Sequence, residues 1–255
     1  MRALGPAALA ASCLLSGWPA VCPAAVDAGG SVALTQDNIY RGVSQTCGHP
    51  AAQADLHVRE RGTTDGVAFA GVWASAGLSG SRCGSASELD AYAGYSLALT
   101  AAVSATFTYT RYTFPRGGYY GRPYPPAERS GYDQLAMSWS VAERLYLTLA
   151  WTPDALHYEP YAGSLRAQWG RRAWAYGLQW RQPLASWLWL TAGGGYDRIA
   201  DPFGTGYGFW SVGLSHVAGR LELDLAYFRT ADRAVRLFGP DSAGGRVAAT
   251  VLWRF

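Results

Sequence analysis

Arg246-Val-Ala-Ala-Thr-Val-Leu-Trp-Arg-Phe255 is the last stretch of the chain, and it carries the clearest structural pattern in the sequence. Apolar side chains at every second position, from Val247 to Phe255, oppose a face that carries both arginines. This two-residue period predicts a β-strand with one apolar and one polar face. An aromatic final residue, two positions after Trp253, is typical of bacterial outer-membrane barrels. One such strand could belong to any half-buried sheet, so the prediction depends on repetition elsewhere.

Similar alternation recurs along the whole chain. Leu223 and Leu225, for example, oppose Glu222 and Asp224, whereas an amphipathic helix would place those charges on every side. Very short links alternate with long links rich in Gly, Pro and Tyr. Scoring part of 153–171 as a strand gives 13 strands, but treating it as one external loop gives 12 and keeps the alternation. We therefore predict an all-β, transmembrane, antiparallel up-and-down barrel of about 12 strands with both termini in the periplasm.

Each predicted strand is close to the roughly 9 to 11 residues that a tilted membrane strand needs. Two of them, 66–76 and 186–197, are apolar on both faces, so the alternation does not assign their phase. The predicted strands are 31–41, 51–60, 66–76, 88–98, 101–112, 132–141, 144–152, 172–182, 186–197, 207–217, 220–229 and 246–255.

The composition supports the same class. Hydrophobic residues make up 49% of the chain and charged residues only 15%, where a water-soluble domain carries roughly a quarter. The 11 Trp and 16 Tyr fit the aromatic girdles of a membrane barrel. After residue 28 no apolar run approaches the roughly 18 to 20 residues of a transmembrane helix. The net charge of +3 is small and scattered, which argues against a nucleic-acid partner.

The amino-terminal segment 1–28 resembles an export signal, with Arg2 before a short apolar run of small residues. Cleavage is expected between residues 25 and 28, which would leave 29–255 as a single barrel domain in the bacterial outer membrane. Its expected partners are membrane lipid, lipopolysaccharide and the barrel-assembly machinery, which would read Phe255. That mature chain keeps Cys47 and Cys83, for which a disulfide is expected in an oxidising compartment, with two free thiols as the alternative.

Polar positions opposite the apolar faces should line the interior, because an Arg on the lipid side costs about 2–4 kcal/mol at mid-depth. They could neutralise one another in a closed core, or they could form a narrow hydrated path whose charges tune ion preference. Arg41 is expected either to clamp a carboxylate such as Glu88 or Asp90, or to bind an anionic solute. The candidate set is Asp37, Arg41, Gln53, Asp55, His57, Arg59, Glu88, Asp90, Gln134, Arg144, Gln179, Arg181, Glu222, Asp224 and Arg246.

The segment Asp37-Asn-Ile-Tyr-Arg-Gly-Val-Ser-Gln-Thr46, followed by Pro50-Ala-Ala-Gln-Ala54, resembles the TorF-type porin family of proteobacterial outer-membrane proteins. Further similar motifs are Glu88-Leu-Asp-Ala-Tyr-Ala-Gly-Tyr95 and Trp151-Thr-Pro-Asp154. The sequence departs from this pattern at Gln134, where the resemblance implies an acidic residue. The resemblance implies an outer-membrane barrel more strongly than it implies any particular solute.

The expected function is passive diffusion of ions or small polar solutes, with no cofactor, no metal and the possibility of a homo-oligomer. A non-conducting surface or adhesion barrel that acts through its loops is the alternative. A lipid hydrolase is a third option. Such an enzyme would need a Ser–His pair near the outer leaflet. The four histidines, His49, His57, His157 and His216, are dispersed and show no such motif.

Overall fold

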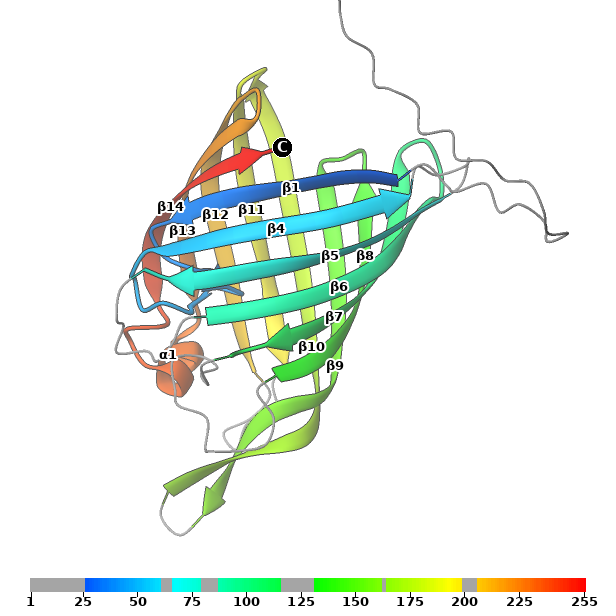
Figure 1. Cartoon of the computed structure of the whole chain (residues 1–255). Coiled ribbons are helices and arrows are strands. Elements are labelled where there is room, and N and C mark those ends of the chain that lie inside the picture. The colour runs from blue at the N-terminus through cyan, green and yellow to red at the C-terminus, as the bar shows by residue number, and fades with distance from the viewer. Residues whose placement is uncertain (1–25, 61–65, 79–86, 116–130, 162–163, 199–205) are drawn as a thin grey trace, which may run out of the picture.

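The computed structural model describes residues 26–60, 66–78, 87–115, 131–161, 164–198 and 206–255, with side chains described outside 156–171. Twelve strands close into one antiparallel barrel, in which successive wall strands pair and the first pairs with the last (Figure 1). The predicted barrel of 12 strands is therefore confirmed. The wall consists of β1 (Val26–Thr35), β4 (Ala51–Glu60), β5 (Gly66–Gly77), β6 (Ser87–Ala98), β7 (Val103–Thr113), β8 (Gly131–Val141), β9 (Leu145–Tyr161), β10 (Ser164–Ala185), β11 (Leu188–Arg198), β12 (Tyr207–Ala218), β13 (Leu221–Thr230) and β14 (Gly245–Arg254).

The first and last strands close the barrel. β14 pairs antiparallel with β1, so that Val32 lies opposite Trp253 and Thr35 opposite Thr250. The terminal stretch that carries the strongest sequence pattern is thus the strand that removes the last free edge of the sheet. Among the described residues, the one α-helix, α1 (Asp232–Phe238), is far too short to cross a bilayer.

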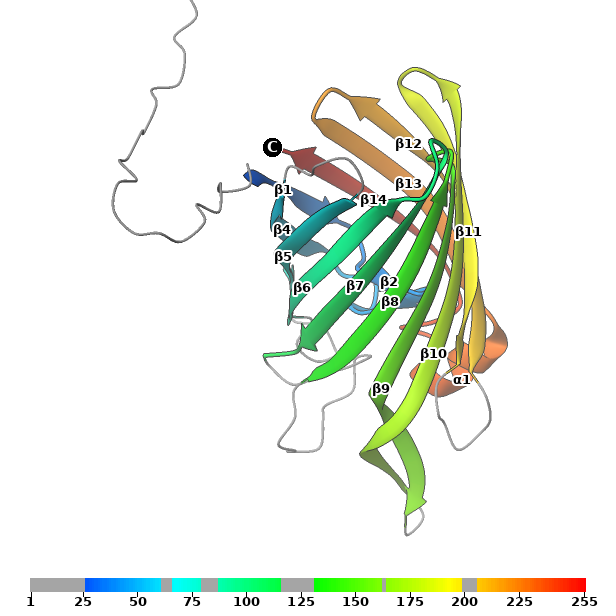
Figure 2. The same cartoon turned by 90° about the vertical axis from the view of Figure 1, so that its right-hand side faces the viewer.

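Three predicted strands, 31–41, 144–152 and 172–182, were wrong in their bounds. The first strand, expected at 31–41, runs from Val26 to Thr35, and the chain then leaves the wall. The segment 153–171, expected to be a loop, instead lengthens β9 and β10, which continue as a paired ribbon beyond the barrel rim (Figure 2). The strand count is unaffected, because the ribbon extends two existing strands and adds none.

The two faces of the wall differ in chemistry. On β12, Trp210, Val212 and Leu214 are exposed on the outer face, whereas Ser215 on the inner face is only 1% exposed. The same alternation assigns the phase of β5, where Val72 is exposed. A band of exposed apolar side chains around a whole protein is unusual in water, but it matches the hydrocarbon of a bilayer.

The two ends of the barrel differ in their connections. At one end, here called the turn end, strands are joined by short turns such as Ala142-Glu143, where φ is 51° and 55°. Positive φ at both central residues is the two-residue hairpin geometry that matches strand twist. The opposite end, here called the loop end, carries the long connections and α1 (Figure 1). The predicted alternation of short and long links is visible, although the side of the membrane that each end faces stays a prediction.

Candidate functional site

Residues 36–48, here called the inward hairpin, leave the wall after β1 and fold into the barrel. Two short strands, β2 (Ile39–Tyr40) and β3 (Val43–Ser44), pair across a tip formed by Arg41 and Gly42. Gly42 has φ 77°, and a Cβ there would lie 2.8 Å from side-chain atoms of Phe209 and Thr230. Only glycine fits both the left-handed backbone and this close contact with the wall.

The base of the hairpin is fixed by buried polar contacts. Asp37 accepts hydrogen bonds from Ser44 Oγ and Thr46 Oγ1 within the hairpin, and Arg246 on β14 forms an ion pair with it at 2.9 Å. Asn38 Nδ2 donates to Ser75 Oγ on β5 at 3.2 Å. Two polar residues of the opening motif, Asp37 and Asn38, therefore hold the hairpin against the wall, and an unpaired polar group at either buried position would be costly.

The tip of the hairpin reaches across the interior through Arg41. Its Nη1 donates to Asp197 Oδ2 on β11 at 3.3 Å, and its Nη2 donates to Gln134 Oε1 on β8 at 3.4 Å. The guanidinium carbon also lies 4.7 Å from the Tyr40 ring centre, within cation–π range. Arg41 is thus a structural clamp, but the expected partners Glu88 and Asp90 were wrong, because the carboxylate that it binds belongs to Asp197.

Aromatic rings continue this contact along the wall. Tyr40 lies 6.3 Å from Tyr112 on β7, which stacks on Tyr132 of β8 at 4.5 Å between ring centres. Phe114 lies 6.2 Å beyond, against Tyr132. The stack gives the loop end of the lumen a rigid aromatic side next to the hairpin tip.

The other side of the hairpin packs on the long connection before β14. Val43 is fully buried in a cluster with Tyr207, Ala234 and Ala243. Cys47 is disulfide-bonded, and its Sγ lies 3.4 Å from Ser242 Oγ. Cys83, its expected partner, lies outside the described residues, so that pairing stays a prediction.

A cavity of about 430 Å³ lies between the hairpin tip and the wall. Gly177 on β10 and Gly193 on β11 contribute no side chains there, and a Cβ at Gly177 would meet nothing closer than 3.9 Å. Thr148, Gln179 and Ser211 supply uncharged polar groups to its lining. The glycines therefore leave open a space beside the tip that polar solutes could occupy.

Two further clusters of polar side chains, one around Glu222 and one around Asp55, lie toward the turn end. Glu222 accepts from Ser215 Oγ at 2.6 Å and pairs with both Arg254 and Arg181, the latter at 3.5 Å. This side of the lumen is stabilised by charge-assisted bonds.

The second cluster is centred on Asp55 of β4. Asp55 bonds to His57 Nδ1 at 2.6 Å and accepts from Tyr92 Oη at 2.6 Å. Arg59 lies 4.0 Å from Asp27, which the candidate set omitted because the first strand was placed too late in the chain.

The structure distributes the candidate residues over several strands. Arg144 lies in the exposed turn between β8 and β9, at the rim and not along the wall. Asp197, Tyr40 and Tyr112 belong to the site but were missed. The remaining candidates occupy inward positions of the wall, namely Gln53, Asp55, His57, Arg59, Glu88, Asp90, Gln134, Gln179, Arg181, Glu222, Asp224 and Arg246, or lie in the inward hairpin, namely Asp37 and Arg41. Their part in conduction stays a prediction.

The described histidines form no serine-based catalytic arrangement. His57 bonds to Asp55, and His216 lies against the Trp187 ring at 5.4 Å. Within the ranges that the structure describes, no three His, Cys, Asp or Glu side chains are grouped to hold a metal ion.

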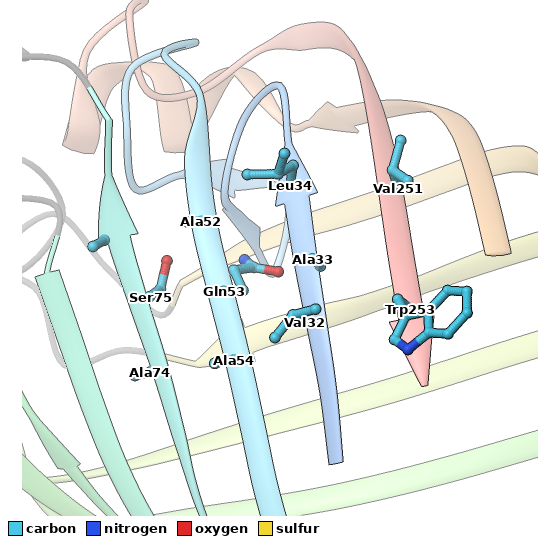
Figure 3. Close-up of a pocket in the computed structure, with 11 residues that line it drawn as sticks. Val32, Ala33, Leu34, Ala52, Gln53, Ala54, Ala74, Ser75, Val251 and Trp253 are labelled. Carbon is cyan, nitrogen blue, oxygen red and sulfur yellow. The ribbon is translucent and has the colours of Figure 1, made fainter. Parts of the chain in front are cut away.

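A shallow groove of about 560 Å³ lies outside the wall where β14, β1, β4 and β5 meet (Figure 3). Alanines form its floor, and Val32, Leu34, Val251 and Trp253 form its borders. The groove belongs to the apolar outer band and not to the lumen.

Comparison with known proteins gives both a fold and a family. The chain is similar to a structure described as "Unveiling the Mechanism Behind the in-meso Crystallization of Membrane Proteins", with a TM-score of 0.58, 9% identity, and 89% of this chain and 83% of that chain covered. It is also similar to the NanC porin, with a TM-score of 0.49, 8% identity, and coverage of 88% and 97%. For the complex of Salmonella typhi OmpF with daunomycin the TM-score is 0.46 and the identity 9%, with 90% of this chain and 97% of that chain covered.

No curated protein matches the chain. A model of the family described as "Bacterial protein of unknown function (Gcw_chp)" matches residues 20–246, which is most of the sequence. The chain therefore belongs to the bacterial Gcw_chp family.

Proposed function

We propose that this protein is an outer-membrane channel for passive diffusion of ions or small polar solutes, which pass beside the inward hairpin. One observation carries the proposal: the closed barrel has an apolar outside and a polar inside, and the cavity next to Arg41 is not filled by side chains. If the polar side chains of the interior only neutralised one another, the wall would not need to leave open space at Gly177 and Gly193. The resemblance of the hairpin motif to TorF-type porins agrees with this proposal.

Export through a cleaved amino-terminal signal belongs to the same proposal. β1 begins at Val26, and Val26 to Ala28 pair with β4. Cleavage after Ala25 would keep the whole strand, whereas cleavage after Ala28 would remove three of its ladder positions. The earlier site is the one that we propose.

Uptake into liposomes tests the channel directly. Phospholipid vesicles that contain the purified protein should take up small neutral solutes and should exclude solutes that are larger than the cavity. Gly177→Trp should reduce this uptake severalfold, because position 177 lines the cavity and an added Cβ there would meet nothing closer than Thr148 Cβ at 3.9 Å. Gly208→Trp is the matched control, since the alternation on β12 directs that side chain outward. Uptake that is equal in both variants would contradict the proposed path.

A non-conducting surface protein is the second candidate, and one observation favours it. The paired continuation of β9 and β10 projects beyond the rim, where a partner could reach it (Figure 2). Loss of cell-surface binding after its removal, in a protein that admits no solute, would favour this candidate.

A further inference from the structure

The charges of the interior are not balanced at the level of the inward hairpin. Two arginines lie there, and each has a carboxylate partner: Arg41 pairs with Asp197 at 3.3 Å and Arg246 with Asp37 at 2.9 Å. Both pairs are largely buried, so each arginine is neutralised where it stands. A solute that passes the hairpin therefore meets little net positive charge from them.

Two more carboxyl groups, Glu88 and Asp90, lie at the same level without such a partner. Glu88 is opposite Ser75, the residue that receives the hydrogen bond of Asn38, and Asp90 is opposite Tyr112. Asp90 is only 6% exposed, and its Oδ1 has no hydrogen-bond partner. Neither carboxyl group takes part in an ion pair among the described residues. They leave an excess of acidic groups at the level of the hairpin.

The same excess extends over the rest of the interior. At the inward wall positions and in the hairpin, the described residues include more acidic side chains than arginines. Yet the whole chain has a net charge of +3, so the acidic excess is particular to the interior. The acidic residues are Asp27, Asp37, Asp55, Glu88, Asp90, Asp197, Glu222 and Asp224, and the arginines are Arg41, Arg59, Arg181, Arg246 and Arg254.

We infer that the channel conducts cations in preference to anions, and that Glu88 and Asp90 beside the hairpin are the residues that set this preference. The inference rests on the proposed channel function. Rings or pairs of carboxylates in a narrow, low-dielectric passage attract cations and repel anions, and the effect is strongest where the passage is narrowest.

The reversal potential of the full chain in a planar bilayer under a KCl gradient tests this inference. Recording at low ionic strength limits screening, and pH 9 favours the ionised form of carboxyl groups. We expect a reversal potential of the sign that cation flow produces. In the Glu88→Gln/Asp90→Asn double variant, the ratio of cation to anion permeability should fall roughly threefold or more.

Asp133→Asn is the matched control. Asp133 is a carboxylate on β8 that bonds to Tyr109 and Arg111 on the outer side of the wall. Its removal should leave the reversal potential unchanged. The single Asp90→Asn variant should show a smaller shift of the same sign and serves if the double variant does not fold.

The outcomes separate the two proposals. A current without cation preference, or an unchanged permeability ratio in both the single and double variants, would overturn the inference while the channel function stands. No current from the folded full chain would overturn the channel function, and the inference with it.

Discussion

Replacement of the inward hairpin by a short flexible link will raise the conductance of the barrel severalfold. The hairpin contacts β5 through Asn38, β8 and β11 through Arg41, and β14 through Asp37. A segment that is anchored on opposite sides of a closed wall occupies the section between them. Its removal should leave a lumen that is limited only by the wall itself, which is intermediate in width between filled small barrels and open large porins.

The variant replaces residues 38–46 by Gly-Ser-Gly and keeps Cys47 and the Asp37–Arg246 pair. Arg41→Ala provides an intermediate variant, because it releases the tip from Asp197 and Gln134 but keeps the hairpin. Its current should fluctuate between levels without reaching the full increase. The heat-dependent mobility of folded barrels in gels checks that each variant is folded. Equal conductance of the parent and of the folded deletion variant would show that the hairpin does not narrow the path.

An arginine on the outer face should destabilise the barrel far more than one on the inner face of the same strand. Val212 is exposed between Trp210 and Leu214 on the apolar outer side of β12, whereas Ser211 lines the cavity. At mid-bilayer depth, Val212→Arg should cost about 2–4 kcal/mol. Ser211→Arg should cost much less, because its guanidinium can remain hydrated, although it should also obstruct the cavity.

Urea titration of folding into phospholipid vesicles measures this difference. The two variants differ by one position in sequence and carry the same added charge, so each controls for the other. Similar losses of stability in both variants would mean that the outer face of β12 is not in contact with hydrocarbon.

The wall of the barrel was predictable because its signal is local. A strand such as 246–255 shows its two faces within ten residues, and β14 occupies nearly the same range. The ribbon of β9 and β10 was missed because a strand within 153–171 was counted as an additional wall strand and rejected to keep 12, whereas the segment extends two existing strands.

The inward hairpin was not predictable, because its contacts are distant in the sequence. Arg41 and Asp197 are 156 residues apart, and Asp37 and Arg246 are 209 apart. Nothing in the sequence near Arg41 indicates which carboxylate will face it, and Asp197 ends a glycine-rich strand whose phase the alternation left open. The motif itself was found, but its position inside the barrel required the structure.

The proposed channel function is tested most directly by the current through the intact, purified protein in a planar lipid bilayer. If the protein is a channel that its hairpin narrows, we expect discrete conductance steps, small for the intact chain and larger once the hairpin is replaced. A folded barrel that inserts and yet gives no steps, with or without its hairpin, would contradict it.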